Sequence, residues 1–263
     1  MTGRVALVTG AGRGIGAATV LALAQAGWSV LATDSVADDP ALPYPMAGRR
    51  DLSRLAAQAG PAGQVYPFIA DVRDPAAVRA AVAEAESRWG GLDAAIAAAG
   101  VIAGGVPLWQ VPEPQQQAVL DVDLGGVLTL ARAAIPALLR RPAPRSGRFL
   151  AVASAAATRG LPMLAAYCAA KAGVAGLIRA LAAELADSGV TANAVSPGST
   201  ATPILAESAR LYGLPGAEAF AQQQPIGRLL DPAEVAAVLA FLAGPGSSGM
   251  TGAVVPVDGG LAL

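Results

Sequence analysis

The sequence predicts an α/β protein of three layers, with a doubly wound parallel sheet of seven strands between two layers of helices. Seven short apolar runs alternate along the chain with helical patterns, which is the order expected when helices connect parallel strands. The apolar runs are nearly continuous rather than alternating, as in strands that are buried on both faces. Since no linker or internal repeat divides its 263 residues, we expect a single domain, 1–263.

The elements follow in order from these patterns. Predicted strands cover residues 4–9, 28–33, 64–70, 93–98, 147–153, 190–196 and 253–257. Predicted helices cover 17–26, 51–59, 75–89, 113–139, 162–187 and 231–243. Asp74-Pro75 and Asp231-Pro232 are typical helix starts. We expect the helix 113–139 to break near Gly125-Gly126. Residues 35–50 are rich in proline and are expected to be irregular.

Composition excludes several classes of function. The chain has no histidine and one cysteine, so it cannot form an internal disulfide, an ordinary His/Cys zinc site or a Ser-His-Asp triad; we expect no metal. Its 18 basic and 19 acidic residues show no basic surplus of the kind that nucleic-acid-binding proteins carry. We interpret the arginines at 140, 141, 145 and 148 as a solvated helix end and loop.

The apolar runs do not indicate targeting or membrane insertion. The first one starts at Val5, and the longest uncharged run, 94–112, is interrupted by glycines and prolines. Neither pattern is typical of a signal peptide or a membrane-spanning helix. We therefore expect a soluble, cytoplasmic protein that binds no membrane and no nucleic acid.

A glycine-rich turn joins the first strand to the first helix. Strand, glycine turn and helix are the context that a phosphate-cradling motif requires. A helix N-terminus offers free N–H groups and partial positive charge to a pyrophosphate. The pattern therefore predicts a Rossmann-type dinucleotide site, with a plain tight turn as the alternative. The candidate residues are Gly10, Arg13, Gly14, Ile15 and Gly16.

Asp34 ends the second strand and bears on the choice of cofactor. An acidic residue at this point can accept a hydrogen bond from a ribose 2′-hydroxyl and repel a 2′-phosphate, which favours NAD over NADP. Arg13 points the other way, because a cation there could meet a 2′-phosphate. We give Asp34 more weight because it would lie directly at the ribose; its alternative role is a strand-end cap.

Two further strand ends carry candidate cofactor residues. Asp71-Val72 follows the third strand, where the carboxylate could contact the adenine amine or cap the next helix. Ala98 and Gly100 follow the fourth, where small residues let the backbone approach a ribose or pack tightly. Residues 35–50 are either a loop near the adenosine or a surface insertion.

The chemistry is expected around Ser154, Tyr167 and Lys171. Ser154 follows the fifth strand, and Tyr167 and Lys171 are four residues apart in a predicted helix, so they share one face. A free phenol has a pKa of about 10, and a nearby cation favours its phenolate. Asp123, between apolar Val122 and Leu124, either points inward as part of this site or faces solvent. Cys168 is interpreted as a small residue on the helix face.

Four motifs in order along almost the whole chain resemble the short-chain dehydrogenase/reductase family, of the classical type. They are TGAGRGIG at 9–16, YCAAK at 167–171, NAVSPG at 193–198 and VDGG at 257–260. The resemblance implies that Tyr167 exchanges a proton with the substrate oxygen, that Lys171 lowers the tyrosine pKa and holds the nicotinamide ribose, and that Ser154 orients the substrate. It also implies a homotetramer. The same resemblance places Pro197, Thr200 and Thr202 along the nicotinamide.

The chain departs from the family pattern at two places. The family's NNAG after the fourth strand is Ala97-Ala98-Ala99-Gly100 here, so the asparagine side chains that brace neighbouring strands are missing. The family's fourth catalytic residue, an asparagine, falls on Asp123. That position acts in the family largely through its main chain, which an aspartate could preserve while adding a negative charge near Lys171.

The finer details are similar to the mycofactocin-coupled branch of the family. These details are ADDPALPYPMA, AAAGVIAGG, VASAAATRGLP and NAVSPGSTAT. The branch resemblance implies tightly held NAD, electron transfer to a peptide-derived carrier and alcohol oxidation as the physiological direction.

The sequence thus predicts an NAD-dependent oxidoreductase of a secondary alcohol or ketone. We expect the substrate pocket between Ser154, Tyr167 and a loop at about 199–226, and apolar residues there (Ile204, Leu205, Leu211, Tyr212, Leu214) indicate a lipophilic substrate. The alternatives are a biosynthetic NADPH-dependent ketoreductase and a non-catalytic NAD-sensing protein.

Overall fold

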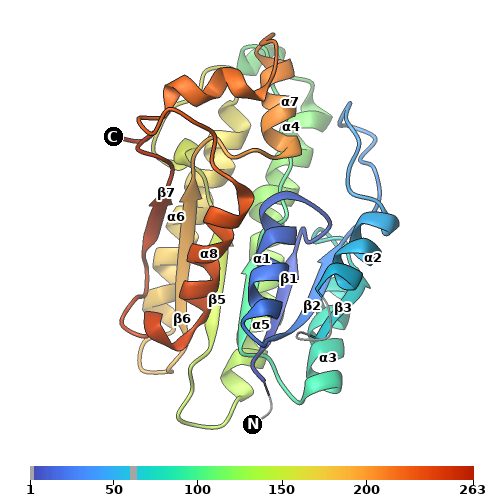
Figure 1. Cartoon of the computed structure of the whole chain (residues 1–263), viewed down its shortest axis with the longest axis vertical. Helices are drawn as coiled ribbons and strands as arrows, with labels where there is room; N and C mark the ends of the chain where they lie inside the picture. Colours follow the sequence, from blue (N-terminus) through green and yellow to red (C-terminus); the bar gives the residue numbers. More distant parts are fainter. Residues whose placement is uncertain (1–2, 60–63) are drawn as a thin grey trace.

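A seven-stranded parallel sheet forms the centre of the computed structural model, which describes residues 3–59 and 64–263. Its order is β3-β2-β1-β4-β5-β6-β7, and every neighbouring pair is parallel. This confirms the predicted Rossmann-type fold (Figure 1). The strands are β1 (Val5–Thr9), β2 (Ser29–Asp34), β3 (Gln64–Ile69), β4 (Ala94–Ala97), β5 (Arg148–Val152), β6 (Thr191–Pro197) and β7 (Val254–Val257).

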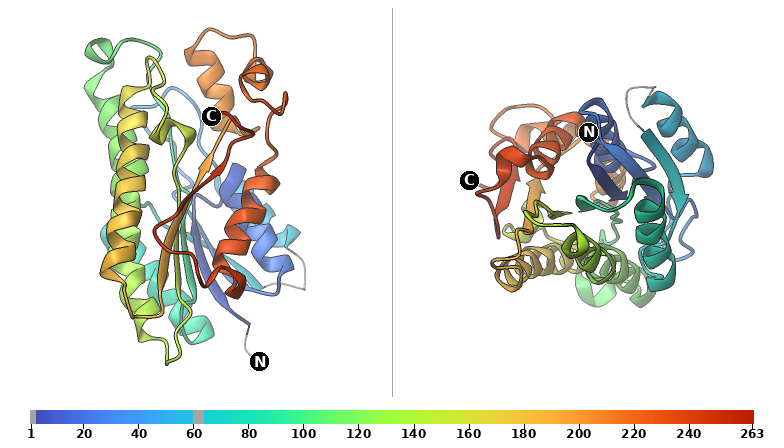
Figure 2. Two further views of the ribbon diagram at one scale, coloured as in Figure 1. Left: turned by 90° about the vertical axis from the view of Figure 1, so that its left-hand side faces the viewer. Right: turned by 90° about the horizontal axis from the view of Figure 1, so that it is seen from below.

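Helices cover both faces of the sheet and make two separate apolar cores. The helices are α1 (Gly14–Gln25), α2 (Arg49–Gln58), α3 (Pro75–Trp89), α4 (Glu113–Leu120), α5 (Gly126–Arg140), α6 (Ala165–Glu184), α7 (Pro203–Leu211) and α8 (Pro232–Ala243). One core packs α3, α5 and α6 against the sheet, and the other packs α1, α2 and α8. The end-on view shows the three layers (Figure 2).

The two long helices differ from their predicted form in instructive ways. Helix α6 begins at Ala165 rather than 162, because Pro162 is followed by Met163 in the left-handed region (φ 61°). The α-helical pattern of 113–139 is interrupted next to Gly125-Gly126, as predicted, but by a π-helical turn, η2 (Asp121–Gly125), that joins α4 to α5. At Gly126 a Cβ would lie 2.6 Å from Val72 Cγ2, so this glycine permits a close approach between α5 and Val72, in the turn between β3 and α3.

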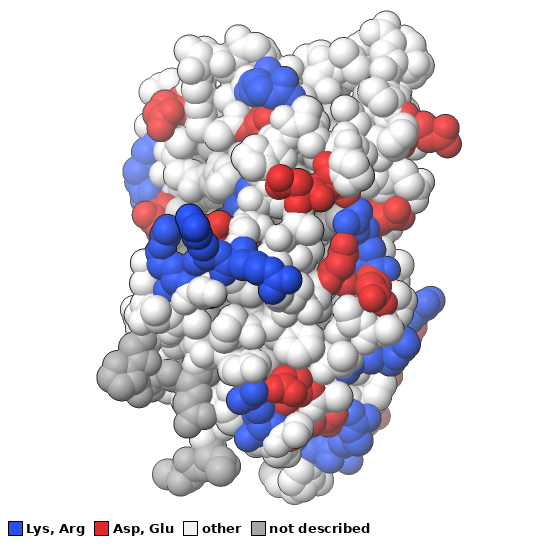
Figure 3. Space-filling model, turned by 90° about the vertical axis from the view of Figure 1, so that its right-hand side faces the viewer, with Lys and Arg blue, Asp and Glu red and all other residues white. Residues whose placement is uncertain are grey.

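The arginine cluster near the end of α5 is only partly solvated. Arg140 and Arg141 do lie at the surface, where they pair with Glu86 and Asp93. Arg148, by contrast, is the first residue of β5 and is 2% exposed, so the solvated interpretation is wrong for this residue. Elsewhere charges of both signs are intermixed, as the face carrying α2 and α3 shows (Figure 3).

Two helical runs, Glu113–Arg140 and Ala165–Glu184, are long and apolar enough to cross a membrane by length and composition alone. Both cover the same face of the sheet (Figure 2). Core helices of soluble proteins pass the same test, so this finding is weak evidence for membrane insertion.

Candidate active site

A cavity of about 780 Å³ opens at the carboxyl ends of the strands, where open α/β sheets bind their ligands. Its volume lies within the range of small-molecule sites, roughly 300–1,000 Å³. All but one of the predicted site residues line it. They are Gly10, Arg13, Gly14, Ile15, Gly16, Asp34, Asp71, Val72, Ala98, Gly100, Ser154, Tyr167, Lys171, Pro197, Thr200 and Thr202.

The glycine turn has the shape of a phosphate cradle. Gly10 adopts φ +64°, and a Cβ there would lie 2.5 Å from Ala99 Cα. A Cβ on Gly16 would collide with the Gly10 carbonyl oxygen. Helix α1 begins at Gly14 without any side-chain cap, so its first N–H groups lack an intrahelical or capping partner. The turn therefore fits the pyrophosphate of a dinucleotide.

Asp34 braces this turn. One carboxylate oxygen accepts a hydrogen bond from the Gly12 N–H at 2.9 Å, and the other accepts from the Val36 N–H at 3.1 Å. Each oxygen retains a further lone pair, and the residue lines the cavity. The cap and the ribose contact are therefore compatible roles for one carboxylate.

Arg13 is held by the irregular segment 35–48. Its guanidinium donates to the Pro45 carbonyl at 2.6 Å and to Met46 Sδ at 3.3 Å, and lies 6.0 Å from the Tyr44 ring centre. The segment itself lines the cavity near Asp34 through Ser35, Ala37, Asp39, Met46 and Ala47. It is therefore a wall of the site rather than a remote surface insertion.

Asp71 binds a neighbouring arginine, Arg73, a partner that neither of its two predicted roles, adenine contact or helix cap, includes. Arg73 binds its carboxylate at 2.6 Å and bridges it to Asp39 at 2.5 Å. Burial raises the pKa of Asp71, but its hydrogen bonds to Arg73 outweigh this and hold the pKa below its ordinary value. The helix-cap alternative is wrong for Asp71, because Asp74 caps α3 by accepting from the Ala76 N–H.

The strand ends that lack the family's asparagines are braced from the neighbouring strand. The Thr9 hydroxyl, at the end of β1, accepts hydrogen bonds from the N–H groups of Ala98 and Ala99 at 3.2 and 3.3 Å. A side-chain brace therefore exists here, although it comes from the other strand.

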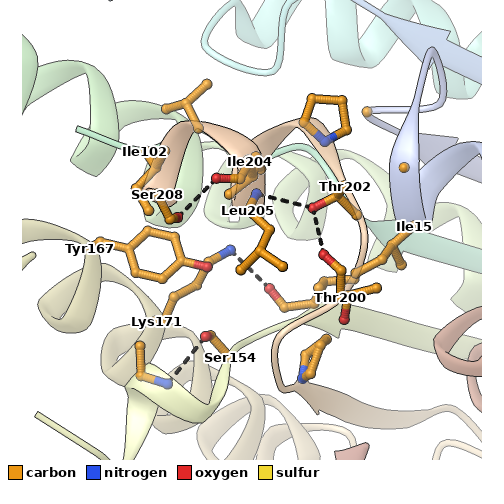
Figure 4. Close-up of a pocket in the computed structure, with 18 of the residues that line it drawn as sticks. Ile15, Ile102, Ser154, Tyr167, Lys171, Thr200, Thr202, Ile204, Leu205 and Ser208 are labelled. Carbon is orange, nitrogen blue, oxygen red and sulfur yellow. Dashed lines mark hydrogen bonds between the residues drawn. The ribbon is translucent and has the colours of Figure 1, made fainter. Parts of the chain in front are cut away.

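Ser154, Tyr167 and Lys171 meet at the centre of the cavity (Figure 4). Ser154 follows β5, where its Oγ accepts from the Ala156 N–H at 3.1 Å and also bonds the Tyr167 hydroxyl. Lys171 Nζ lies 5.6 Å from the Tyr167 ring centre and donates to the Val152 carbonyl at 3.1 Å. The spacing in α6 thus brings phenol and ammonium to one face, as predicted.

Asp123 is the predicted site residue that does not line the cavity. It is fully buried in η2, so the solvent-facing alternative is wrong. Its Oδ1 accepts from the Val101 N–H at 2.8 Å, and its Oδ2 lies 3.2 Å from Lys171 Nζ. Asp123 is therefore a positioning residue behind Lys171 rather than a catalytic residue in contact with substrate.

Burial and this ion pair set the charge states of the site. Burial raises the pKa of Tyr167, Lys171 opposes the rise and Asp123 adds to it, so the phenol pKa lies above its ordinary value. Burial alone would lower the pKa of Lys171, but Asp123 raises it above its ordinary value. Burial also raises the pKa of Asp123 above its ordinary value, whereas Lys171 and the hydrogen bond from the Val101 N–H lower it by less.

The part of the cavity beyond Tyr167 is mostly apolar. Ile204, Leu205, Tyr212 and Leu214 line it as expected, whereas Leu211 lines a separate cavity of about 200 Å³. Figure 4 shows Ile102, Ile204 and Leu205 around the Tyr167 ring. Sequence reasoning missed the contribution of the loop before α6 and of the C-terminus, since no local pattern marks them. These lining residues are Arg159, Leu161, Pro162 and Leu164 before α6 and Leu261 at the C-terminus, to which the segment after β4 adds Ile102.

Comparison with known proteins identifies the family. A family model described as Enoyl-(Acyl carrier protein) reductase matches residues 10–262. Cis-4-hydroxycyclohexanecarboxylate dehydrogenase of Sinomonas cyclohexanicum is 38% identical over 98% of this chain and 96% of its own. The chain belongs to the short-chain dehydrogenase/reductase family.

Other members of this family are similar over their whole length. Cyclohexanol dehydrogenase of Acinetobacter sp. is 36% identical over 97% of this chain and 94% of its own. The crystal structure of carveol dehydrogenase from Mycobacterium avium in complex with NAD has a TM-score of 0.93, with 31% identity over 99% of this chain and 98% of that one. A solved ketoreductase relative carries NADPH.

The protein is therefore an oxidoreductase that interconverts alcohols and ketones with a nicotinamide cofactor, which sets aside a purely nucleotide-sensing role. The glycine turn, Asp34 and the Pro197–Thr202 loop would hold this cofactor. When bound, it supplies the hydride donor or acceptor. Tyr167 and Ser154, which line the cavity beside Lys171, are the candidates for the acid–base group and for the hydroxyl that orients the substrate.

Proposed function

We propose that the protein is an NAD-dependent dehydrogenase of lipophilic, cyclic secondary alcohols. The observation that carries this proposal is the position of Tyr167. It stands between the half of the cavity built by the glycine turn and Asp34 and the apolar half built around α7.

The proposed acid–base step uses only residues already in contact. Tyr167 removes the hydroxyl proton of the alcohol, or returns it to the ketone in reduction. Ser154 bonds both the phenol and the substrate oxygen, which fixes the distance over which the proton moves. Lys171, anchored on the Val152 carbonyl, keeps a positive charge beside the phenol and favours the phenolate.

Asp34 and Arg13 together support NAD over NADP. The Asp34 carboxylate lies within hydrogen-bond reach of the glycine turn and would repel a 2′-phosphate. The guanidinium of Arg13 is engaged by Pro45 and Met46, so binding a 2′-phosphate would require it to leave these partners. The NADPH-dependent ketoreductase, which Arg13 alone favours, is the second candidate.

The substrate class rests on the lining and on two relatives. The apolar half holds leucines, Ile204, Tyr212 and Phe220, with few polar groups. Relatives at 38% and 36% identity are dehydrogenases of cis-4-hydroxycyclohexanecarboxylate and of cyclohexanol. A six-membered ring carrying a secondary alcohol suits such a pocket.

We further propose the branch and the assembly that the sequence motifs imply. The branch is the mycofactocin-coupled one, in which NAD stays bound, a peptide-derived carrier accepts the electrons and the alcohol is oxidised. The wall formed by segment 35–48 over the Asp34 side of the cavity supports retention of NAD. The assembly is a cytoplasmic homotetramer of single-domain chains.

The test is turnover of cyclohexanol and substituted cyclohexanols with NAD and with NADP, followed by dye reduction if bound NAD does not exchange. We expect Tyr167→Phe to lose about two to four orders of magnitude in kcat, the usual contribution of a general base. Tyr66→Phe, which changes a tyrosine on β3 outside the cavity, is the matched control. Wild-type rates in Tyr167→Phe contradict the mechanism, and a clear preference for NADP contradicts the role of Asp34.

A further inference from the structure

A carboxylate is buried directly behind the catalytic lysine. Asp123 has no exposed surface, and the Lys171 side chain is 5% exposed. Asp123 Oδ2 has no hydrogen bond among the described residues, so its contact with Lys171 Nζ at 3.2 Å is its one polar contact there. A Cβ on Gly100 would lie 3.5 Å from Asp123 Oδ2 and 3.6 Å from Lys171 Nζ. The backbone therefore closes over the pair on that side.

The charged and titratable groups around the Tyr167 phenol come from several elements. Lys171 and Cys168 lie on α6 itself, and Asp123 lies on η2. Tyr44, from segment 35–48, accepts a hydrogen bond from the Ile102 N–H and feels the Asp123 charge, while Glu207 of α7 acts on Tyr44. Glu207 is itself paired with Arg210. Within residues 3–59 and 64–263, Lys171 is thus the one cation acting on the phenol, and Asp123 forms an ion pair with that cation.

We propose that Asp123 offsets the charge of Lys171 at the Tyr167 phenol and so sets the pH at which the enzyme oxidises alcohols. The ammonium favours the phenolate, and the buried carboxylate beside it opposes this effect. Because the pair is buried, solvent and salt screen its effect on Tyr167 much less than they screen surface charges. Asp123 thereby acts on Tyr167 indirectly, through the charge of Lys171. As a result, Tyr167 loses its proton and becomes a base only in alkaline solution.

The proposal rests on Tyr167 being the acid–base group and has its own measurable consequence. Oxidation requires the phenolate and reduction the phenol, so oxidation gains rate and reduction loses it as pH rises through the Tyr167 pKa. Removing the Asp123 charge leaves Lys171 unopposed and should lower that pKa by roughly one pH unit, as expected for one charge acting through a partly polarisable interior.

The experiment compares the pH dependence of kcat/KM for cyclohexanol oxidation in the wild type, Asp123→Asn and Asp121→Asn. Asparagine keeps the shape of aspartate and its acceptor for the Val101 N–H. We expect the midpoint of the rising limb to move about one pH unit lower in Asp123→Asn. Asp121, which is partly exposed and bonded to Gln117, is the matched control and should leave the midpoint unchanged.

A spectroscopic titration separates this proposal from the proposed function and does not require a variant at 123 to fold. The tyrosinate absorbance of Tyr167, taken as wild type minus Tyr167→Phe in the protein as purified, should have its midpoint at or above the ordinary phenol value of about 10. A midpoint well below that value overturns the proposal, as does an unshifted profile in an active Asp123→Asn. Loss of oxidation in Asp123→Asn with a lowered Tyr167 midpoint supports it.

Discussion

Arg148 carries a charged side chain in an almost fully buried position. It is 2% exposed at the start of β5, its guanidinium donates to the Gly147 carbonyl, and Nε has no partner among the described residues. Burial, with Arg4 nearby, lowers its pKa below the ordinary value. A buried charge without a counter-ion costs free energy that an apolar side chain of similar size does not.

We therefore expect Arg148→Met to raise the free energy of unfolding by about 1 kcal/mol, measured by urea denaturation. Arg179→Met, at an exposed position on α6, should stay within about 0.5 kcal/mol of the wild type. A loss of stability in Arg148→Met alone would show that the guanidinium stabilises the fold.

At the scale of single residues, the sequence predicted which residues form the site better than it predicted which partners each of them contacts. The spacing of Tyr167 and Lys171 is enough to place both on one face, because helical geometry is local. The engagement of Arg13 by Pro45 was not predictable, since it depends on how the segment 35–48 folds back. The ion pair of Asp123 with Lys171 was predictable only as a hypothesis, because residues 48 positions apart meet there through tertiary packing.

Among the elements, the segment 35–48 illustrates the limit of sequence patterns. Its prolines predicted an irregular path but left its location open. The location follows from three long-range contacts: Asp39 with Arg73, Arg13 with Pro45, and the Ile102 N–H with the Tyr44 hydroxyl. Leu42 also packs into the apolar cluster with Val72 and Val101.

These contacts predict how the segment affects cofactor release. Tyr44→Phe keeps the ring beside Arg13 but removes the acceptor of the Ile102 N–H, a loss of about 1 kcal/mol. We expect NAD to dissociate up to about tenfold faster from the variant, measured by stopped-flow exchange against labelled NAD. Tyr66→Phe is again the control. Rapid exchange in the wild type would contradict tight retention, and unchanged exchange in Tyr44→Phe would contradict the anchoring role.

For the whole molecule, the doubly wound parallel sheet of seven strands was predictable, because each strand and each connecting helix is encoded locally and right-handed parallel connections leave few arrangements. The ends of elements were less predictable: the left-handed conformation of Met163 decides that α6 starts at Ala165, and packing against Val72 makes Gly126 a contact point. The apolar half of the cavity is assembled from segments more than 150 residues apart, such as Ile102 and Leu261, so its full lining required the structure.

Exposed apolar side chains bear on the assembly. Phe241 of α8 is 52% exposed, and Ile226 near the C-terminal turn is 46% exposed. Exposed large apolar side chains are one feature of surfaces that contact another subunit. We expect light scattering to give about four times the 25.9 kDa chain mass. The mass of one chain would contradict the homotetramer.

Because of the π-turn Asp121–Gly125, the number of residues in the helix between Pro112 and Arg141 determines whether Asp123 can reach Lys171. A π-turn holds one residue more than an α-helical turn, and each α-helical residue rotates the chain by about 100°. Deleting one residue within the turn would leave a good helix, yet α4 and α5 could not both keep their contacts. We therefore expect an insertion or deletion of one residue at that point to separate Asp123 from Lys171, whose ion pair spans the turn and α6.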